Sequence, residues 1–291
     1  MWIVLSLISA IFDALRLSIN KFFGKSFDTL TVAFELLFCM LPFMAVFAFF
    51  TFKSVPVTNI NFLITVFVAV LAYTSGLFLL IEATKRTDLS IVAPIVALTP
   101  VFILVWEFIL FGTLPSVFGL IGILLIVSGS YLLNFSKIKT SGLIAPFKAI
   151  LRKDEGLIPL LIAVIFSIGA TGDKLAVSYT DVYSYASIHP FVAFLFGSIY
   201  IFIIRRKKVN FDIFKKPLWV FAHGASLSIM FISNILALAF ASASYVIAMK
   251  RTSALFGVIF GGLFFKEKGI RERFLGAMVI LSGIVVLSFL G

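Results

Sequence analysis

The sequence predicts an all-helical integral membrane protein with ten transmembrane helices, arranged as two inverted five-helix repeats around a central cavity. Hydrophobic residues make up 62% of the chain and charged residues 13%, whereas about half of a typical soluble domain is apolar. A membrane-spanning helix needs roughly 20 mainly apolar residues, so a chain of 291 residues has room for many spans and for no large soluble domain. The third observation is an internal repeat, described below.

Ten apolar stretches are separated by charged or turn-forming loops, and we expect each stretch to form one helix. The first stretch has no basic region before it and no small-residue cleavage site, so we expect a retained span and not a signal peptide. The expected helices of the first half are 2–23, 30–51, 60–82, 89–111 and 116–134, and those of the second half are 157–178, 184–204, 217–240, 244–265 and 274–290.

These helices define three parts of the chain. Residues 1–134 form the first five-helix repeat, residues 157–291 form the second, and residues 135–156 connect them. In the connecting loop, apolar residues with helical spacing follow Pro146, which favours a short helix at the membrane interface.

The basic residues are distributed unevenly between the two sides of the membrane. Nineteen Lys and Arg residues lie in the loops that follow the first, third, fifth, seventh and ninth helices, and only Lys53 and Lys174 lie at the opposite side. Basic loops usually face the cytoplasm. We therefore expect these odd-numbered loops to be cytoplasmic and both termini to lie outside, in an inner or plasma membrane. The net charge of +11 reflects these loops and does not indicate a nucleic-acid partner.

The two halves of the chain contain matching segments. Residues 122–129 (GILLIVSG) match residues 276–283 (GAMVILSG) at an offset of 154. Near the other end of the repeat, Asn20-Lys21 follows an Ile-Phe pair as Asp173-Lys174 does. Because five helices per half is an odd number, the second copy would be inverted. Inverted repeats are typical of secondary transporters, whose binding site lies near the membrane midplane.

Two long segments resemble a known family. The run LSIVAPIVALTPVFILVWEFILFG, followed by GLIGILLIVSGSYLL, resembles the first-half signature of ten-helix EamA-like permeases in the drug/metabolite transporter superfamily. The run YVIAMKRTSALFGVIFGGLFFKEK, followed by FLGAMVILSGIVVL, resembles the second-half signature. The resemblance implies a ten-helix inverted-repeat fold, a central cavity and transport.

The resemblance also concerns particular residues. The family often has a glutamate near the ends of the fourth and ninth helices; Glu267 fits this pattern, whereas the first half has Thr113. Lys250 and Arg251 are similar to a cationic pair in the ninth helix of phosphate-ester and nucleotide-sugar antiporters of the same superfamily. The resemblance implies that the pair contacts substrate phosphate.

Lys250 and Arg251 are also informative without the resemblance, because they are the only charges in the stretch 244–265. A cation near the bilayer centre costs about 2.5–3.5 kcal/mol on insertion scales, so it usually faces a cavity or a partner. With Ser253 nearby, the pair would form an anion site in which Arg251 orients the ligand and Lys250 attracts it. The alternatives are an internal ion pair beside a packing seam at Gly257 and Gly261, or a misplaced helix boundary.

Further candidates lie on the first, third and ninth helices. Asp13, Arg16 and Asn20 share one face of the first helix and form either a cavity wall or a structural polar stripe. Tyr73 and Tyr245 are additional candidates for binding substrate.

Glu35 and His189 are separated by the repeat offset of 154. Together with Asp13 they are candidates for proton coupling, since burial raises the pKa of a glutamate and histidine titrates near physiological pH. The alternative, which we favour, is that Glu35 and His189 lie near helix ends and touch headgroups or water. His223 is also expected near an interface.

Pro94 and Pro100 lie six residues apart in the expected helix 89–111. Proline removes a backbone donor and kinks a helix. We therefore expect a bend that either turns backbone carbonyls toward the cavity or is a tolerated kink without a ligand.

The function predicted from these features is secondary transport. We expect a small polar metabolite, an organic anion or zwitterion, to cross the bilayer by alternating access, coupled to a proton or a counter-solute. No soluble-enzyme motif occurs, and two histidines and one cysteine are too few for a protein-built zinc site, so neither catalysis nor a cofactor is expected. The alternatives are an exporter of amphipathic or cationic compounds, a lipid-headgroup flippase and a membrane scaffold that transports nothing.

Overall fold

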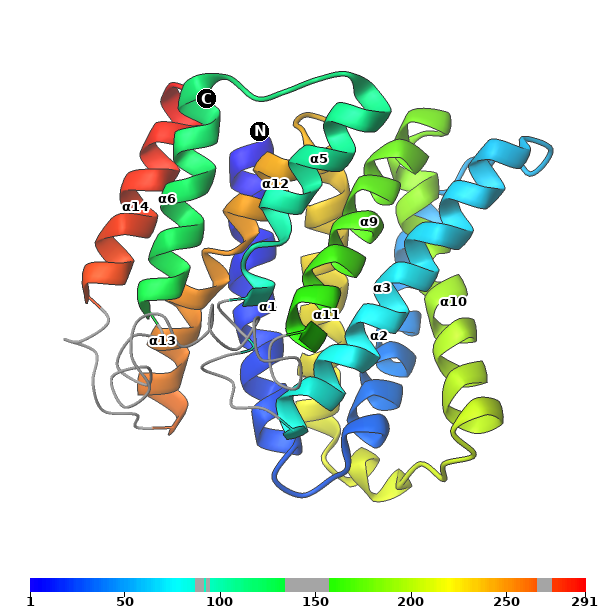
Figure 1. Ribbon diagram of the computed structural model, residues 1–291. Coiled ribbons are helices and arrows are strands. Elements are labelled where there is room, and N and C mark those ends of the chain that lie inside the picture. Colours follow the sequence, from blue (N-terminus) through cyan, green and yellow to red (C-terminus); the bar gives the residue numbers. More distant parts are fainter. Residues whose placement is uncertain (87–91, 93–94, 134–156, 266–273) are drawn as a thin grey trace.

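The computed structural model describes residues 1–86, 92, 95–133, 157–265 and 274–291, and every regular element in these residues is a helix (Figure 1). Seven helical segments have the length and apolar composition needed to cross a membrane, and three further apolar helices are shorter. This architecture is that of a multi-pass membrane protein. The expected interfacial helix in 135–156 and the residue Glu267 lie outside the described residues.

The helices follow the apolar stretches closely. Those of the first half are α1 (Trp2–Phe23), α2 (Thr29–Thr51), α3 (Ile60–Arg86), α5 (Thr99–Phe111) and α6 (Val117–Leu133). Those of the second half are α9 (Leu157–Tyr179), α10 (Val182–Ile199) with the π-helical turn η1 (Tyr200–Ile204), the 3-10 turn η2 (Phe211–Lys215), α11 (Pro217–Leu238), α12 (Ala243–Lys250), α13 (Ser253–Phe265) and α14 (Phe274–Phe289).

Side-chain caps fix where three of these helices begin. The Asp28 carboxylate accepts a hydrogen bond from the backbone N–H of Thr31 at the start of α2. Asp181 caps α10 and Ser242 caps α12 in the same way. Such caps satisfy N–H groups that the first turn of a helix leaves without partners.

The expected continuous helix over 244–265 is wrong, because the span is interrupted. Helix α12 ends at Lys250, Arg251 and Thr252 form a turn, and α13 begins at Ser253. The N–H of Thr252 bonds to the carbonyl of Met249, three residues back, at 3.0 Å. This tight turn replaces the α-helical pattern without any proline or glycine.

The fourth apolar stretch is interrupted at the matching place. Ala97 and Leu98 form a turn directly before α5, and they lie 154 residues before Arg251 and Thr252. Pro100 follows within the first turn of α5, where a missing N–H costs nothing. Pro94 lies outside the described residues, and the bend expected near Pro100 is present as the turn at Ala97 and Leu98.

Glycines on α6 and α14 make these two helices pack closely, side by side in Figure 1. A Cβ atom at Gly276 would lie 2.5 Å from the backbone nitrogen of Leu133, and one at Gly283 would lie 2.8 Å from that of Ile126. A Cβ atom at Gly129 would lie 2.7 Å from the backbone nitrogen of Ile280. The repeated segments 122–129 and 276–283 thus form one antiparallel packing seam, as small residues do in membrane helix pairs.

The remaining helices also pack across the two halves of the chain. Helix α1 packs against α11 and α13, and helix α9 packs against α3 and α5. Helix α2 packs against both α10 and α11. The bundle is therefore an interleaved one, in which helices from the first 133 residues lie next to helices from the second half.

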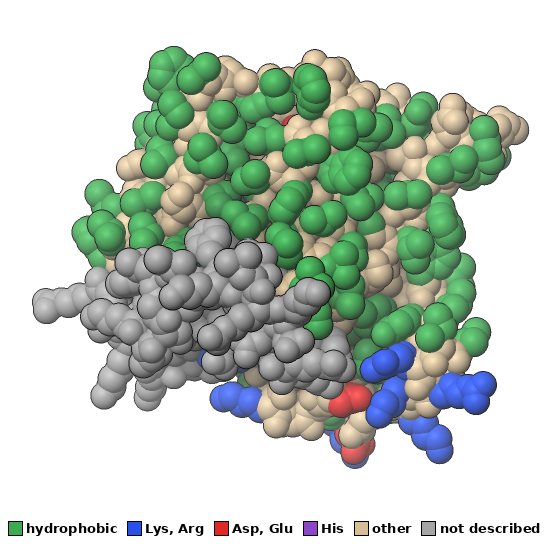
Figure 2. Space-filling view, viewed as in Figure 1, with side chains coloured by type: hydrophobic (Ala, Val, Ile, Leu, Met, Phe, Trp, Pro, Cys, Tyr) green, Lys and Arg blue, Asp and Glu red, His purple; other side chains and the backbone are tan. Residues whose placement is uncertain are grey.

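The two ends of the bundle differ in charge. Both termini lie at the top of Figure 1. In Figure 2 the Lys and Arg side chains of the described residues gather at the lower edge, and hydrophobic side chains cover most of the visible flank. The charge asymmetry that the sequence predicts is thus visible in the described part of the molecule.

Candidate functional site

A cavity of about 180 Å³ lies among α1, α3, α9, α11 and the break between α12 and α13. Within a largely apolar bundle, it gathers several ionisable side chains. Those that line it are Asp13 and Arg16 of α1, Tyr73 of α3, Asp173 of α9, and Lys250 and Arg251 at the break.

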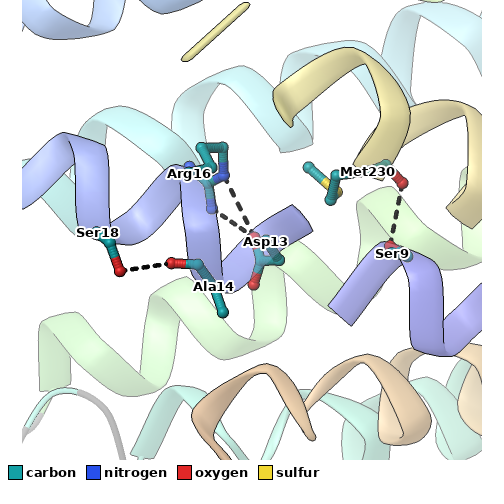
Figure 3. A network of polar contacts seen from close by, with 6 residues as sticks. All are labelled: Ser9, Asp13, Ala14, Arg16, Ser18 and Met230. Atoms are coloured by element: carbon teal, nitrogen blue, oxygen red, sulfur yellow. Dashed lines mark hydrogen bonds and ion pairs between the residues drawn. The ribbon is translucent and has the colours of Figure 1, made fainter. Parts of the chain in front are cut away.

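On α1, Asp13 and Arg16 neutralise each other one turn apart. An Nη atom of Arg16 lies 2.7 Å from an Oδ atom of Asp13, and both side chains are largely buried (Figure 3). One turn earlier, the Ser9 hydroxyl donates to the carbonyl of Met230 on α11 at 3.0 Å. This bond holds α1 against α11 and fixes the position of the ion pair in the cavity wall.

Asp173 supplies the second carboxylate of the cavity. The Tyr185 hydroxyl donates to its Oδ1 atom at 2.6 Å, and the Nε2 atom of His189 lies 3.6 Å from the same oxygen. The rings of Tyr73 and His189 are in edge contact, with centroids 5.7 Å apart. Asp173 was not predicted as a site residue, although its match to Asn20 in the repeated segment is a signal that could have indicated one.

The break between α12 and α13 places Lys250 and Arg251 at the cavity. No carboxylate of the described residues lies within ion-pair distance of either side chain. The Nε atom of Arg251 is buried and has no hydrogen-bond partner. The cavity therefore contains three cationic side chains and two acidic ones, and Asp13 is already paired with Arg16. An anionic ligand would complete the charge balance.

The other predicted substrate residues are not among those that line this cavity. Tyr245 lines a different hollow of about 440 Å³, together with Trp2, Glu107 and the residues around Pro115. Asn20 and Ser253 are not among the lining residues of either hollow, although Ser253 opens α13 directly beside the break. Asn234, on α11, does line the central cavity.

Glu35 has an unforeseen partner. Its carboxylate lies 2.6 Å from the Nδ1 atom of His223, and both side chains are fully buried between α2 and α11. The expectation that Glu35 and His189 touch headgroups or water is wrong, as is the expected interfacial position of His223, since all three are buried. Gly224 allows α11 to lie this close to α2, because a Cβ atom at Gly224 would collide with the backbone carbonyl of Cys39.

A family model described as the EamA-like transporter family matches residues 1–135 and 156–289. The chain belongs to the EamA-like transporter family. The family is described as one of transporters, and the recognition made from the two signature segments is confirmed.

Solved structures support the fold of this EamA-like transporter. Among 23 matching chains, one described only as a crystal structure of a protein has a TM-score of 0.76 at 12% sequence identity. The match covers 99% of this chain and 98% of the other. At this identity the likeness shows the fold alone. No protein with a curated description matches the sequence.

Proposed function

We propose that this EamA-like transporter moves a small organic anion or zwitterion, bearing a carboxylate or phosphate, across an inner or plasma membrane by alternating access. The observation that carries the proposal is the position of Lys250 and Arg251. They line the cavity at a helix break, where both are half-buried, and they have no carboxylate partner among the described residues. Buried charges are normally paired, so the ligand supplies the missing negative charge.

Each residue of the cavity has a role in this proposal. The Arg251 guanidinium binds two oxygens of the ligand in parallel, and the Lys250 ammonium acts as a point charge. The N-terminus of α13 points its partial positive charge at the same place. Asp173, Arg16 and Tyr73 line the remaining wall. In a zwitterionic substrate, Asp173 would receive the ammonium group.

The proposed architecture is ten spans in two inverted halves, residues 1–134 and 157–291. Three observations support it. The family model matches the chain in two separate segments. The two helix breaks lie 154 residues apart. The packing of α1 on α11 and α13 has its counterpart in the packing of α9 on α3 and α5.

We further propose that the basic end of the bundle is cytoplasmic and that both termini lie outside. In that orientation Tyr245 and its hollow lie toward the outer end of the pathway, while Ser253 and Asn20 lie along the route from the cavity. A fluorescent reporter fused to the C-terminus should be dark in this orientation, because such reporters fold poorly outside the cytoplasm. A bright fusion would place the termini inside.

Proton coupling would use the ionisable groups that the helices bury. Asp13 lines the cavity. Glu35 and His189 do not line it, and each lies in a contact between a carboxylate and a histidine, Glu35 with His223 and His189 with Asp173. Exchange for a counter-solute would need no titration of these groups. Transport that drives proton movement in wild type but not in Glu35→Gln would support proton coupling through Glu35. Equal proton movement in both would exclude that residue.

The substrate class can be tested by ligand-induced thermal stabilisation of the purified protein in detergent. Carboxylates, phosphate esters and amines are compared in wild type, Lys250→Ala, Arg251→Ala and the control Lys53→Ala. Lys53 is an exposed cation outside the cavity. Stabilisation by anions that is lost in the first two variants and kept in the control supports the proposal.

Other outcomes would overturn it. Stabilisation by amines alone, unchanged in Lys250→Ala, would favour the export of cationic compounds. An anion that stabilises the protein but shows no flux in proteoliposomes would separate binding from transport and would favour a scaffold.

A further inference from the structure

A second hollow, independent of the cavity, lies between α3 and α10. It has a volume of about 740 Å³ and shares no lining residue with the central cavity, because it uses a different face of α3. Its walls are largely apolar and include Leu71, Phe78, Phe196 and Ile199. Leu71 and Ile199 are exposed on the flank of the bundle, so the hollow is a groove that opens toward the hydrocarbon of the membrane.

One end of this groove is basic. Arg205 and Lys207 line it there, directly after the π-helical turn η1. Both are exposed. The segment after α10 lies at the lower end of the bundle in Figure 1, the end at which the described Lys and Arg side chains gather in Figure 2. Among the described residues, the one acidic residue that lines the groove is Asp28, and it already accepts a hydrogen bond from the N–H of Thr31 as the cap of α2.

The backbone conformation after η1 determines which basic side chains line the groove. Arg206 has a φ of 48°, in the left-handed region, so the chain turns sharply between Arg205 and Lys207. As a result Arg205 and Lys207 line the groove, while Arg206 and Lys208 do not. The Arg205 guanidinium also lies over the Tyr200 ring, 6.0 Å from its centroid.

A buried hydroxyl lies deeper in the groove. Thr74 is 4% exposed, and its Oγ1 atom has no hydrogen-bond partner. A hydroxyl that is withdrawn from water without a partner is unfavourable. A ligand with an acceptor oxygen between its charged and its apolar parts would satisfy this group.

We propose that the groove is a binding site for an anionic phospholipid. The phosphate lies between Arg205 and Lys207, an ester carbonyl accepts a hydrogen bond from Thr74, and one acyl chain lies along the apolar walls of α3 and α10. Basic pockets between membrane helices commonly hold anionic lipid headgroups. A free phosphate would satisfy the two cations but would leave the apolar walls and Thr74 without a partner.

The proposal can be tested by native mass spectrometry of the purified protein titrated with phosphatidylglycerol. The test variant Arg205→Gln/Lys207→Gln is compared with Arg206→Gln/Lys208→Gln, which removes the same charge from the same loop. Since each basic residue near a membrane surface contributes about a factor of five to anionic-lipid binding, we expect roughly thirtyfold weaker binding in the test variant. The matched control should bind nearly as wild type does. Equal losses in the two variants would overturn the site.

Two further measurements examine the apolar part. Leu71→Trp keeps every charge and fills the groove, so phosphatidylglycerol should bind much more weakly; unchanged binding would refute the acyl-chain position. Phosphatidylcholine should bind more weakly than phosphatidylglycerol to wild type, and inorganic phosphate should not compete. Equal binding of both lipids, or competition by phosphate, would refute an anionic-lipid site. All substituted side chains are exposed, and each variant's melting temperature without added lipid verifies its fold.

Discussion

Alanine at Gly276 should destabilise the protein, whereas alanine at Gly257 should not. The added Cβ atom at Gly276 would lie 2.5 Å from the backbone nitrogen of Leu133 and 2.9 Å from the carbonyl oxygen of Gly129. Both atoms belong to the backbone, so no side-chain rotation can relieve the collision. Ordinary contacts of this kind exceed 3.4 Å, so α14 would have to move away from α6 by most of an ångström.

The magnitude follows from the chemistry of overpacking, which typically costs about 1–3 kcal/mol. At Gly257 an added Cβ atom would meet nothing within 4 Å. There alanine gains helix propensity, worth about 0.5–1 kcal/mol. The two variants each add one methyl group within a helix of the second half, so Gly257→Ala is a matched control for Gly276→Ala.

The assay is thermal unfolding of both variants in detergent, and the fraction of protein that stays monodisperse after heating is the measured quantity. A loss of 1 kcal/mol corresponds to roughly 2–4 °C for a chain of a few hundred residues. Gly276→Ala should therefore melt clearly below wild type, and Gly257→Ala at or above it. The close approach of α6 and α14 would be refuted if Gly276→Ala melted with wild type or if both variants were equally weakened.

Two other predictions concern polar groups. Glu35→Leu should lower the free energy of unfolding by about 1–3 kcal/mol, because it leaves the buried His223 without its partner. Adding His223→Phe should recover part of this loss, and a double variant less stable than Glu35→Leu would contradict the assignment. Asp181→Ala should cost about 1 kcal/mol at neutral pH through loss of the α10 cap. Partial burial raises the pKa of Asp181, but hydrogen bonds from Ser184 and from the Tyr183 N–H outweigh it, so the net shift is downward. The cap therefore stabilises the fold above the ordinary aspartate pKa of about 3.9 and loses its effect as pH falls through the lowered pKa. Unfolding measured against pH should show wild type approaching Asp181→Ala in acid, and a constant difference would refute the assignment.

Most helices begin and end within a few residues of their predicted bounds, because each is a long apolar stretch between polar loops. The first helix was predicted as 2–23 and is found as Trp2–Phe23. The interruption at Arg251 and Thr252 was missed, since neither residue is a helix breaker. A charged pair within an apolar stretch, such as Lys250 and Arg251, indicates a cavity but does not predict that the helix ends there. In the fourth apolar stretch, by contrast, Pro94 and Pro100 predicted a bend, and the chain turns at Ala97 and Leu98.

For the site, local spacing was enough where the partners lie on one helix. Asp13 and Arg16 were expected on one face of the first helix, and they form an ion pair there. The contacts of Glu35 and Asp173 depend on which helices are neighbours, and the repeat offset alone does not provide this. The offset led to His189 as the counterpart of Glu35, whereas the residue in contact with Glu35 is His223, 188 positions away. Tertiary packing decides such pairs.

The contact between Glu35 and His223 has a consequence for movement. It joins a helix of the first 133 residues to one of the last 135, as the Ser9 bond to Met230 does. Separating the two halves of the chain at this contact would leave a buried carboxylate and a buried imidazole without hydrogen-bond partners. Under the alternating access proposed above, helices α2 and α11 would move together, so the boundary between the moving parts would pass through both halves of the chain instead of running between them.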